Sequence, residues 1–153
     1  MITVRRAESA DAAELVRLRA VMIRDAFGEG DAPQGEWSGI AERQFRVRLG
    51  DSAGLLAAFV VDRPDEPGLA SCAVRSVDTR IASPNSPNGE SGYIFNVATD
   101  PAYRSRGYSR ACIPFNASDI WHNTSSRDRT GIEEHYLVSL LVDDDLLPLS
   151  YTL

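Results

Sequence analysis

The sequence has few of the residues that build metal centres and disulfide scaffolds. It contains two cysteines and two histidines in 153 residues. The cysteines, Cys72 and Cys112, are too few for a disulfide framework and lack the CxxC spacing of a zinc site, so we expect small buried hydrophobic side chains. The histidines, His122 and His135, and the acidic run at 143–145 also fit no metal-ligand spacing. The sequence therefore predicts no metal site.

Long apolar runs and a basic overall charge are absent as well. The longest apolar run, Leu55–Val61, has the length of a strand and falls far short of the roughly 18 residues of a membrane span. Residues 1–6 lack the ordered regions of a signal peptide, so we expect a cytoplasmic protein and no membrane partner. The formal net charge of −6 disfavours nucleic acid as a partner, because such binding requires a basic field. All sixteen basic residues are arginine, which we attribute to codon composition.

The composition changes sharply near residue 112. Residues 1–112 contain seventeen alanines and fourteen arginines, whereas residues 113–153 contain one alanine and two arginines. The last segment instead carries ten serine, threonine and asparagine residues. We therefore divide the chain into a core, residues 1–112, and an atypical C-terminal tail of the same domain, residues 113–153. A frameshift product, a partly disordered segment and a partner-bound segment all stay open as explanations of the tail.

The apolar patterns that are present predict one domain of mixed secondary structure. Strands are indicated where apolar residues alternate or run together, and helices where they recur every three or four residues. These elements predict an α/β (α+β) fold, in which a mixed, largely antiparallel central sheet is flanked by helices. The predicted strands are residues 2–6, 55–61, 69–81 and 91–99, with a weaker pattern at 136–142, and the predicted helices follow a cap at Ser9 and cover residues 38–49.

The residues that carry chemistry lie at 95–110, where a strand ends, a short loop rich in arginine follows and a helix begins. Backbone N–H groups of such a loop can converge on phosphate oxygens, and the positive end of the helix dipole adds favourable potential. Gly107 has no Cβ, so the backbone can approach a diphosphate closely. Arg104, Arg106 and Arg110 add positive charge. The spacing alone also fits a solvated basic turn.

Pro114 is expected to interrupt the helix that should start near Gly107. Proline has no N–H, and its ring clashes with the preceding turn of a helix. The interruption and the composition break both indicate that the segment after residue 112 is unusual.

The segment at 97–109 resembles motif A of the GNAT acetyltransferases. That motif runs from a strand through Asp-Pro-x-Tyr to Arg/Gln-x-x-Gly-x-Gly/Ala. This sequence has Asp-Pro-Ala-Tyr at 100–103 and Arg-Ser-Arg-Gly at 104–107, with Ser109 in place of the final glycine or alanine. The order of strands and helices over about residues 1–112 matches the same family.

The resemblance implies an acetyltransferase that moves the acetyl group of acetyl-CoA to a primary amine of a small molecule or peptide by direct attack. The alternatives are a catalytically impaired CoA-binding remnant and a non-enzymatic interaction module. The implied cosubstrate is acetyl-CoA, without a metal; the amine acceptor is unidentified, and a homodimer stays open. The main-chain donors near Val97 are the expected oxyanion partners. The implied cofactor-binding residues are Val97, Ala98, Thr99, Arg104, Ser105, Arg106, Gly107, Tyr108, Ser109 and Arg110.

The catalytic groups are less well defined by the motif. Family members often use a Glu on this strand, and Glu90, just before the strand, is the catalytic candidate, with a solvated loop residue as the alternative. The family's usual acid is a tyrosine in a Tyr-x-x-x-Gly-Phe neighbourhood, which is missing here, so Tyr136 and Tyr151 receive no role. Trp37 and Phe45 are candidates for lining the acceptor pocket, with core packing as the alternative.

Overall fold

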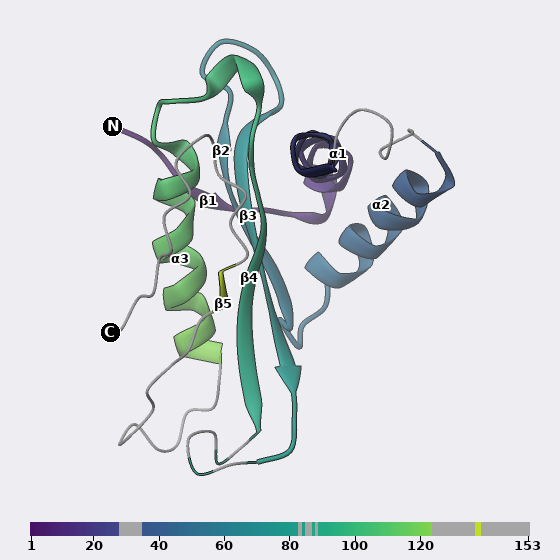
Figure 1. Cartoon of the computed structure of the whole chain (residues 1–153), viewed down its shortest axis with the longest axis vertical. Coiled ribbons are helices and arrows are strands. Elements are labelled where there is room, and N and C mark those ends of the chain that lie inside the picture. The colour runs from purple at the N-terminus through teal and green to yellow at the C-terminus, as the bar shows by residue number, and fades with distance from the viewer. Residues whose placement is uncertain (28–34, 83, 85–86, 88, 124–136, 139–153) are drawn as a thin grey trace.

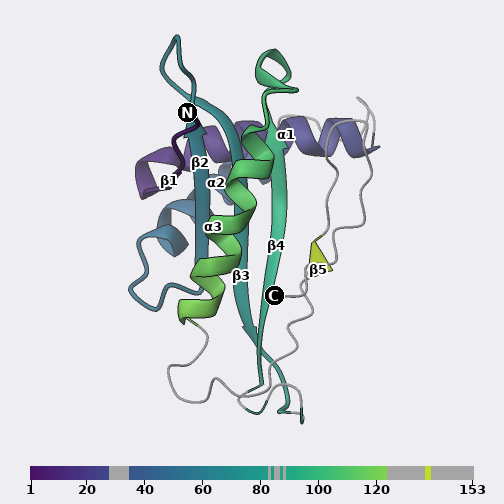
Figure 2. The ribbon, with the colours of Figure 1, turned by 90° about the vertical axis from the view of Figure 1, so that its left-hand side faces the viewer.

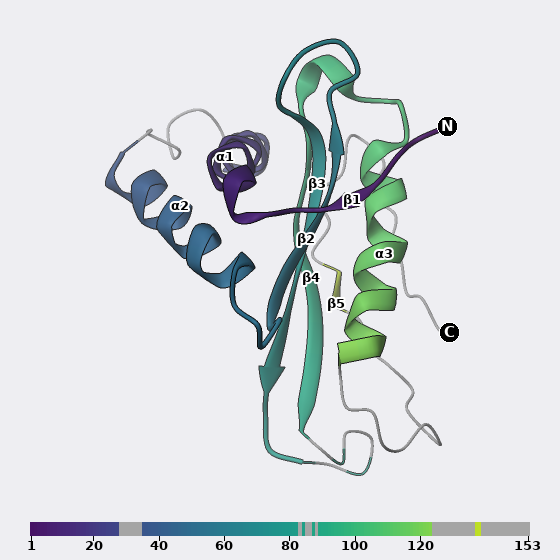
Figure 3. The ribbon, with the colours of Figure 1, turned by 180° about the vertical axis from the view of Figure 1, so that it is seen from behind.

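The protein is a sheet with helices on both faces. The computed structural model describes residues 1–27, 35–82, 84, 87, 89–123 and 137–138. Helices α1 and α2 cover one face of the sheet and α3 covers the other (Figures 1 and 3). This arrangement confirms the predicted α/β (α+β) fold class. The helices are α1 (Ala12–Phe27), α2 (Glu36–Leu49) and α3 (Tyr108–Asn123), and the strands are β1 (Arg5–Arg6), β2 (Leu56–Asp62), β3 (Leu69–Thr79), β4 (Glu90–Thr99) and β5 (Leu137–Val138).

The described strands form one sheet in the order β1-β2-β3-β4-β5. The first four strands are antiparallel neighbours, as the sequence patterns predict for the three long ones. Strand β5 runs parallel to β4, with Tyr93 opposite Leu137 and Ile94 opposite Val138. It falls inside the weaker pattern predicted at 136–142, and the rest of that segment lies outside the described residues.

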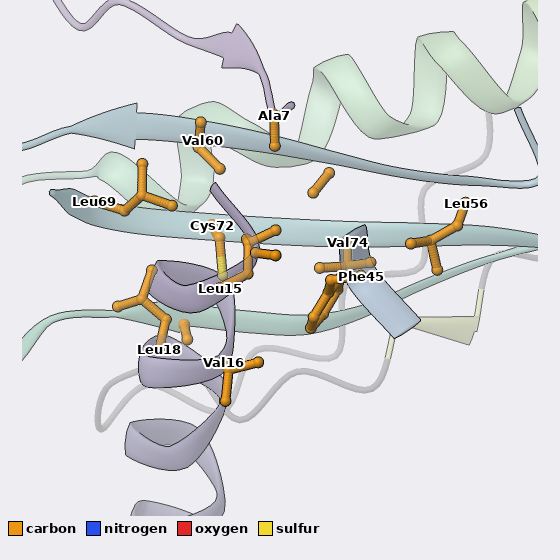
Figure 4. Close-up of a cluster of buried hydrophobic side chains, with 13 residues drawn as sticks. Ala7, Leu15, Val16, Leu18, Phe45, Leu56, Val60, Leu69, Cys72 and Val74 are labelled. Atoms are coloured by element: carbon orange, nitrogen blue, oxygen red, sulfur yellow. The ribbon is translucent and has the colours of Figure 1, made fainter. Parts of the chain in front are cut away.

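Each face of the sheet buries its own hydrophobic cluster, because successive side chains of a strand point to opposite faces. On the face covered by α1 and α2, Leu15, Leu18 and Phe45 pack against Val60 and Val74 (Figure 4). On the α3 face the cluster contains Phe59, Ile94, Val97, Cys112 and Ile113.

Trp37 and Phe45 both contribute to packing in the first of these clusters. Phe45 is buried within it, and the partly buried Trp37 packs against it. Both aromatic rings of α2 thus take part in core packing, and their role in lining an acceptor pocket stays a prediction.

The predicted helix cap at Ser9 is wrong. Ser9 lies inside a short 3-10 turn, η1 (Ser9–Asp11), and its hydroxyl donates to the Arg46 carbonyl at 2.9 Å. Glu8 takes the cap position, and its N–H donates to the Asp11 carboxylate at 2.8 Å. A serine, a glutamate and an aspartate within four residues all suit a helix start, and the tertiary contact of Ser9 with α2 decides among them.

The predicted interruption at Pro114 is also wrong. Helix α3 runs from Tyr108 to Asn123 with Pro114 inside it, so it spans the composition break. A proline in a helix interior costs about 3 kcal/mol, because one backbone hydrogen bond is lost and the ring crowds the preceding turn. The residues just before it, Cys112 and Ile113, are buried against the sheet. Burial of one side chain such as Ile113 stabilises by about 1.5–3 kcal/mol, so packing on the sheet offsets the local penalty.

Candidate functional site

The candidate site lies where β4 ends and α3 begins, at one end of the sheet (Figure 2). Asp100 caps a short 3-10 turn, η2 (Pro101–Tyr103), by accepting the Ala102 N–H at 3.0 Å. The loop 104–107 then leads to Tyr108, the first residue of α3. The predicted order of strand, turn, loop and helix start is thus confirmed.

The loop has a backbone shape that suits an anion. Ser105 and Gly107 have φ angles of 59° and 77°, both in the left-handed region, whereas Arg106 between them does not have a positive φ. Such alternation turns neighbouring N–H groups towards a common concave side. The first helical bond from this region joins the Ala111 N–H to the Gly107 carbonyl at 3.0 Å. The N–H groups of residues 108–110 therefore lack an intrahelical acceptor and lie at the positive end of the α3 dipole.

The base of the loop is fixed by the Asp100 carboxylate. Its Oδ2 accepts from Arg17 at 2.6 Å and from Arg63 at 2.8 Å, and the Asp100 N–H donates to the Ala70 carbonyl at 2.8 Å. Burial alone would raise the pKa of this carboxyl, but the Ala102 N–H and the two guanidinium groups outweigh burial and lower it. One charge thus ties the loop to α1 and to the turn between β2 and β3. Sequence reasoning missed this network, since both arginines lie far from Asp100 along the chain.

The three predicted loop arginines have different surroundings. Arg104 forms an ion pair with Asp25 in the last turns of α1. The Arg106 guanidinium lies over the Tyr103 ring, 5.1 Å from its centroid, and the exposed Arg110 stands in the first turn of α3. Because Asp25 matches the charge of Arg104, Arg106 and Arg110 are the stronger candidates for attracting a phosphate.

Strand β4 carries a bulge just before the loop. Cys72 lies opposite Ala98 and Val74 opposite Phe95, so two β4 residues face the single β3 residue between them. One of the two, Asn96, has a φ of 51°. Among the described residues, β5 pairs only with residues 93 and 94, so the outer edge of β4 from Phe95 to Thr99 has no neighbouring strand. We call this stretch the open edge of β4, in the sense that no described strand pairs with it; the predicted residues Val97, Ala98 and Thr99 lie on it.

The Asn96 side chain connects the bulge to α1. Asn96 is 2% exposed, and its Oδ1 accepts from Arg19 Nη1 at 3.1 Å. The Cys72 thiol donates to the Asn96 carbonyl at 3.4 Å. No sequence motif marks either Arg19 or Asn96, because the two are 77 residues apart.

Glu90 lies at the other end of β4 from the loop. It is the first residue of the strand, pairs with Thr79 across the sheet and is partly buried. Asn96 lies six positions further along the strand, which corresponds to about 20 Å at roughly 3.3 Å per residue. The structure therefore does not bring Glu90 together with the loop or the bulge, and its catalytic role stays a prediction. Tyr136 and Tyr151 lie outside the described residues.

Both cysteines are buried, and we expect neither to react in the folded protein. Burial raises the pKa of Cys112 to about 12 and raises that of Cys72 further. At pH 8 a thiol of that pKa is ionised to the extent of roughly one part in ten thousand, and the thiolate is the reactive form. Iodoacetamide should label neither residue within minutes at pH 8, and should label both once urea unfolds the chain. Rapid labelling of the native protein would contradict the assigned burial.

The part of the chain that the structure describes contains neither a cluster of metal ligands nor a membrane-spanning helix. There, no three or more His, Cys, Asp and Glu side chains gather as a metal site would require. Of the described helices, none has the length and apolar character needed to cross a membrane.

Solved acetyltransferase structures share this fold. A GCN5-related N-acetyltransferase from Ralstonia eutropha superposes with a TM-score of 0.66 at 21% identity, over 80% of this chain and 77% of its own. A predicted acetyltransferase with acetyl-CoA from Clostridium acetobutylicum has a TM-score of 0.66 at 19% identity, over 97% of this chain and 96% of its own. Glucosamine-6-phosphate N-acetyltransferase from Arabidopsis thaliana has a TM-score of 0.59 at 12% identity, over 82% and 78%. No family model and no curated protein matches the sequence.

The chain thus has the fold of the GCN5-related N-acetyltransferases, the GNAT fold. The resemblance predicted from the motif at 97–109 is confirmed at the level of the fold.

Proposed function

We propose that the protein binds acetyl-CoA and transfers its acetyl group to a primary amine of a small molecule or peptide. The observation that carries the proposal is the loop 104–107. Its two left-handed residues open onto the start of α3 and directly follow a bulged strand with an open edge. The similar Clostridium acetobutylicum protein, whose structure includes acetyl-CoA, supports the choice of ligand.

The loop and the start of α3 would hold the pyrophosphate. The N–H groups of residues 105–110 are the proposed donors, and Arg106 and Arg110 supply charge. The open edge of β4 at residues 97–99 would pair with the amides of the pantetheine arm, as an added strand does. The thioester would then lie near the bulge, at the end of the arm.

The proposed chemistry is direct attack of the amine nitrogen on the thioester carbonyl, with the CoA thiolate as the leaving group. The protein first contributes proximity, because the bound arm fixes the carbonyl against the bulge. A main-chain N–H near Val97 would donate to the carbonyl oxygen as negative charge develops on it. Glu90 could remove the amine proton only through intervening water, because about 20 Å of strand separates it from the bulge.

Acetyl-CoA is expected to stabilise the protein against thermal unfolding. A ligand at 100 times its Kd adds about 2.7 kcal/mol of stability, which for a chain of this size corresponds to roughly 5–10 °C in Tm. S-acetylpantetheine lacks the pyrophosphate and should give a much smaller shift. No shift with millimolar acetyl-CoA would overturn the proposal.

A CoA-binding remnant is the second candidate function, and the composition break inside α3 favours it. Release of free CoA thiol in the presence of an amine panel separates the two candidates. If acetyl-CoA raises Tm but no amine causes thiol release, the protein binds acetyl-CoA without catalysing the transfer, and the remnant is the better description. The buried cysteines of the protein itself should not disturb this assay.

A further inference from the structure

Arg19 is a cation on α1 whose charge has no carboxylate partner among the described residues. Arg19 is partly buried, and its Nη1 donates to the neutral side-chain amide of Asn96 at 3.1 Å. A guanidinium carries five N–H donors, and among the described residues this contact engages one of them. A neutral acceptor fixes the position of the group without neutralising it.

Arg17, two residues earlier on α1, provides the contrast. It donates to Glu14 at 2.9 Å and to Asp100 at 2.6 Å, and also to the Leu69 carbonyl at 2.7 Å. Its charge is therefore matched by two carboxylates inside the protein. Arg17 has the environment of a structural arginine, whereas no carboxylate among the described residues neutralises the Arg19 guanidinium.

Arg19 also lies where an acceptor would approach. The loop and α3 are on one side of the sheet, and α1 and α2 are on the other (Figure 1). Helix α1 crosses the strands and continues beyond β4, on the side of its open edge (Figure 2). The two partners of a transfer reaction must reach the carbonyl from different directions, so a donor held by the loop and the β4 edge leaves the α1 side to the acceptor.

The same helix joins the bulge to the loop. Asp25 of α1 pairs with Arg104, and Arg19 contacts Asn96. Arg19 and Asp25 are six positions apart, which corresponds to about 9 Å along a helix at 1.5 Å per residue. A small acceptor held at Arg19 would therefore have its amine within reach of a thioester at the bulge.

We propose that Arg19 binds an anionic group, a carboxylate or a phosphate, on the amine acceptor, and so selects anionic amines as substrates. This inference rests on the proposed acetyl transfer. A planar guanidinium group can form paired hydrogen bonds with either anion, and the contact with Asn96 holds the Arg19 guanidinium in a fixed position.

Matched pairs of amines test the proposal. One arm compares alanine with alaninamide and glutamate with its diamide, and the other compares O-phosphoethanolamine with ethanolamine. In wild-type protein we expect kcat/KM to favour the anionic amine in one of the two comparisons. That comparison identifies whether Arg19 binds a carboxylate or a phosphate. In Arg19→Gln that preference should fall about 10- to 100-fold, the effect of losing one charge-assisted pair, while kcat/KM for the neutral member changes little. Comparing the two proteins cancels the different amine pKa values within each pair.

Two variants complete the design. Arg19→Lys keeps the positive charge but lacks the paired N–H donors of the guanidinium, and it should restore part of the preference for the anionic amine. Arg24→Gln makes the same charge change at an exposed position of α1 and should leave the preference unaltered. If Arg19→Gln lowers kcat/KM equally for both members of a pair, Arg19 only supports the bulge and the proposal fails.

Binding gives a readout that does not require turnover. The complex with CoA should be stabilised by the anionic probes at millimolar concentration in wild-type protein, and less so in Arg19→Gln. Wild-type protein that gains stability from acetyl-CoA but none from any anionic probe would overturn the role of Arg19 and leave the proposed cofactor site standing. Absence of the acetyl-CoA shift itself would instead overturn the proposed function.

Discussion

Replacing Gly107 by valine is expected to weaken acetyl-CoA binding by about 100-fold or more without unfolding the protein. Gly107 has a φ of 77°, where a β-branched residue is strained. Space is not the obstacle, because an added Cβ would meet only Ile2 Cδ1, at 3.9 Å. The loop should therefore change its backbone conformation and turn its N–H groups away from the pyrophosphate. Losing two charge-assisted hydrogen bonds at about 1.5–3 kcal/mol each corresponds to a loss of at least two orders of magnitude in affinity.

Isothermal titration of each variant with acetyl-CoA measures this effect. Gly39→Ala is a matched control in α2, since an added Cβ there would lie 3.6 Å from the flexible Arg43 side chain. It should bind acetyl-CoA like the wild type. Gly107→Asn separates conformation from bulk, because asparagine tolerates a positive φ, and it should bind more tightly than Gly107→Val. Unchanged affinity in Gly107→Val would refute the assignment of the loop.

The parts of the fold and site that the sequence predicts are those encoded by contiguous residues. The strands at 55–61, 69–81 and 91–99 are visible because each carries its own apolar run between turn residues. The loop is visible for the same reason, since its turn, arginines and glycine all lie within 100–110. Local patterns of this kind remain readable in a single sequence.

The parts that the sequence does not predict depend on contacts between distant segments. The Asp100 network joins residues that are 83 and 37 positions apart, and the Arg19–Asn96 contact spans 77. The continuity of α3 through Pro114 has the same origin, because packing against the sheet overrides a local propensity. Arg19, the proposed acceptor contact, is hidden for this reason as well.

Replacing Asp100 by asparagine is expected to lower the free energy of unfolding by about 2–4 kcal/mol, the cost of removing one partner from a largely buried ion pair. The carboxylate is 11% exposed, and its partners Arg17 and Arg63 are 31% and 17% exposed. Without the negative charge these two guanidinium groups would repel each other. An asparagine Oδ1 can still accept the Ala102 N–H, so the turn at η2 should be retained and the loss assigned to charge.

Urea unfolding at pH 7 measures this difference. Asp62→Asn is the matched control, because its carboxylate is 56% exposed and pairs with Arg5 at 2.7 Å. Exposed ion pairs contribute about 0–1 kcal/mol, so this variant should stay close to the wild type. An equal loss of stability in the two variants would contradict the central position assigned to Asp100.

The pH dependence of the same variant identifies the charge as the cause. The pKa of Asp100 is lower in the folded protein than its ordinary value of 3.8, because the Ala102 N–H, Arg17 and Arg63 together outweigh the effect of burial. A lowered folded pKa means that the carboxylate stabilises the fold fully above the unfolded pKa and loses this contribution as pH falls through the folded pKa. The stability difference between wild type and Asp100→Asn should therefore be constant at neutral pH and shrink below about pH 4. A difference that keeps its full size in acid would mean that shape and not charge holds the base of the loop.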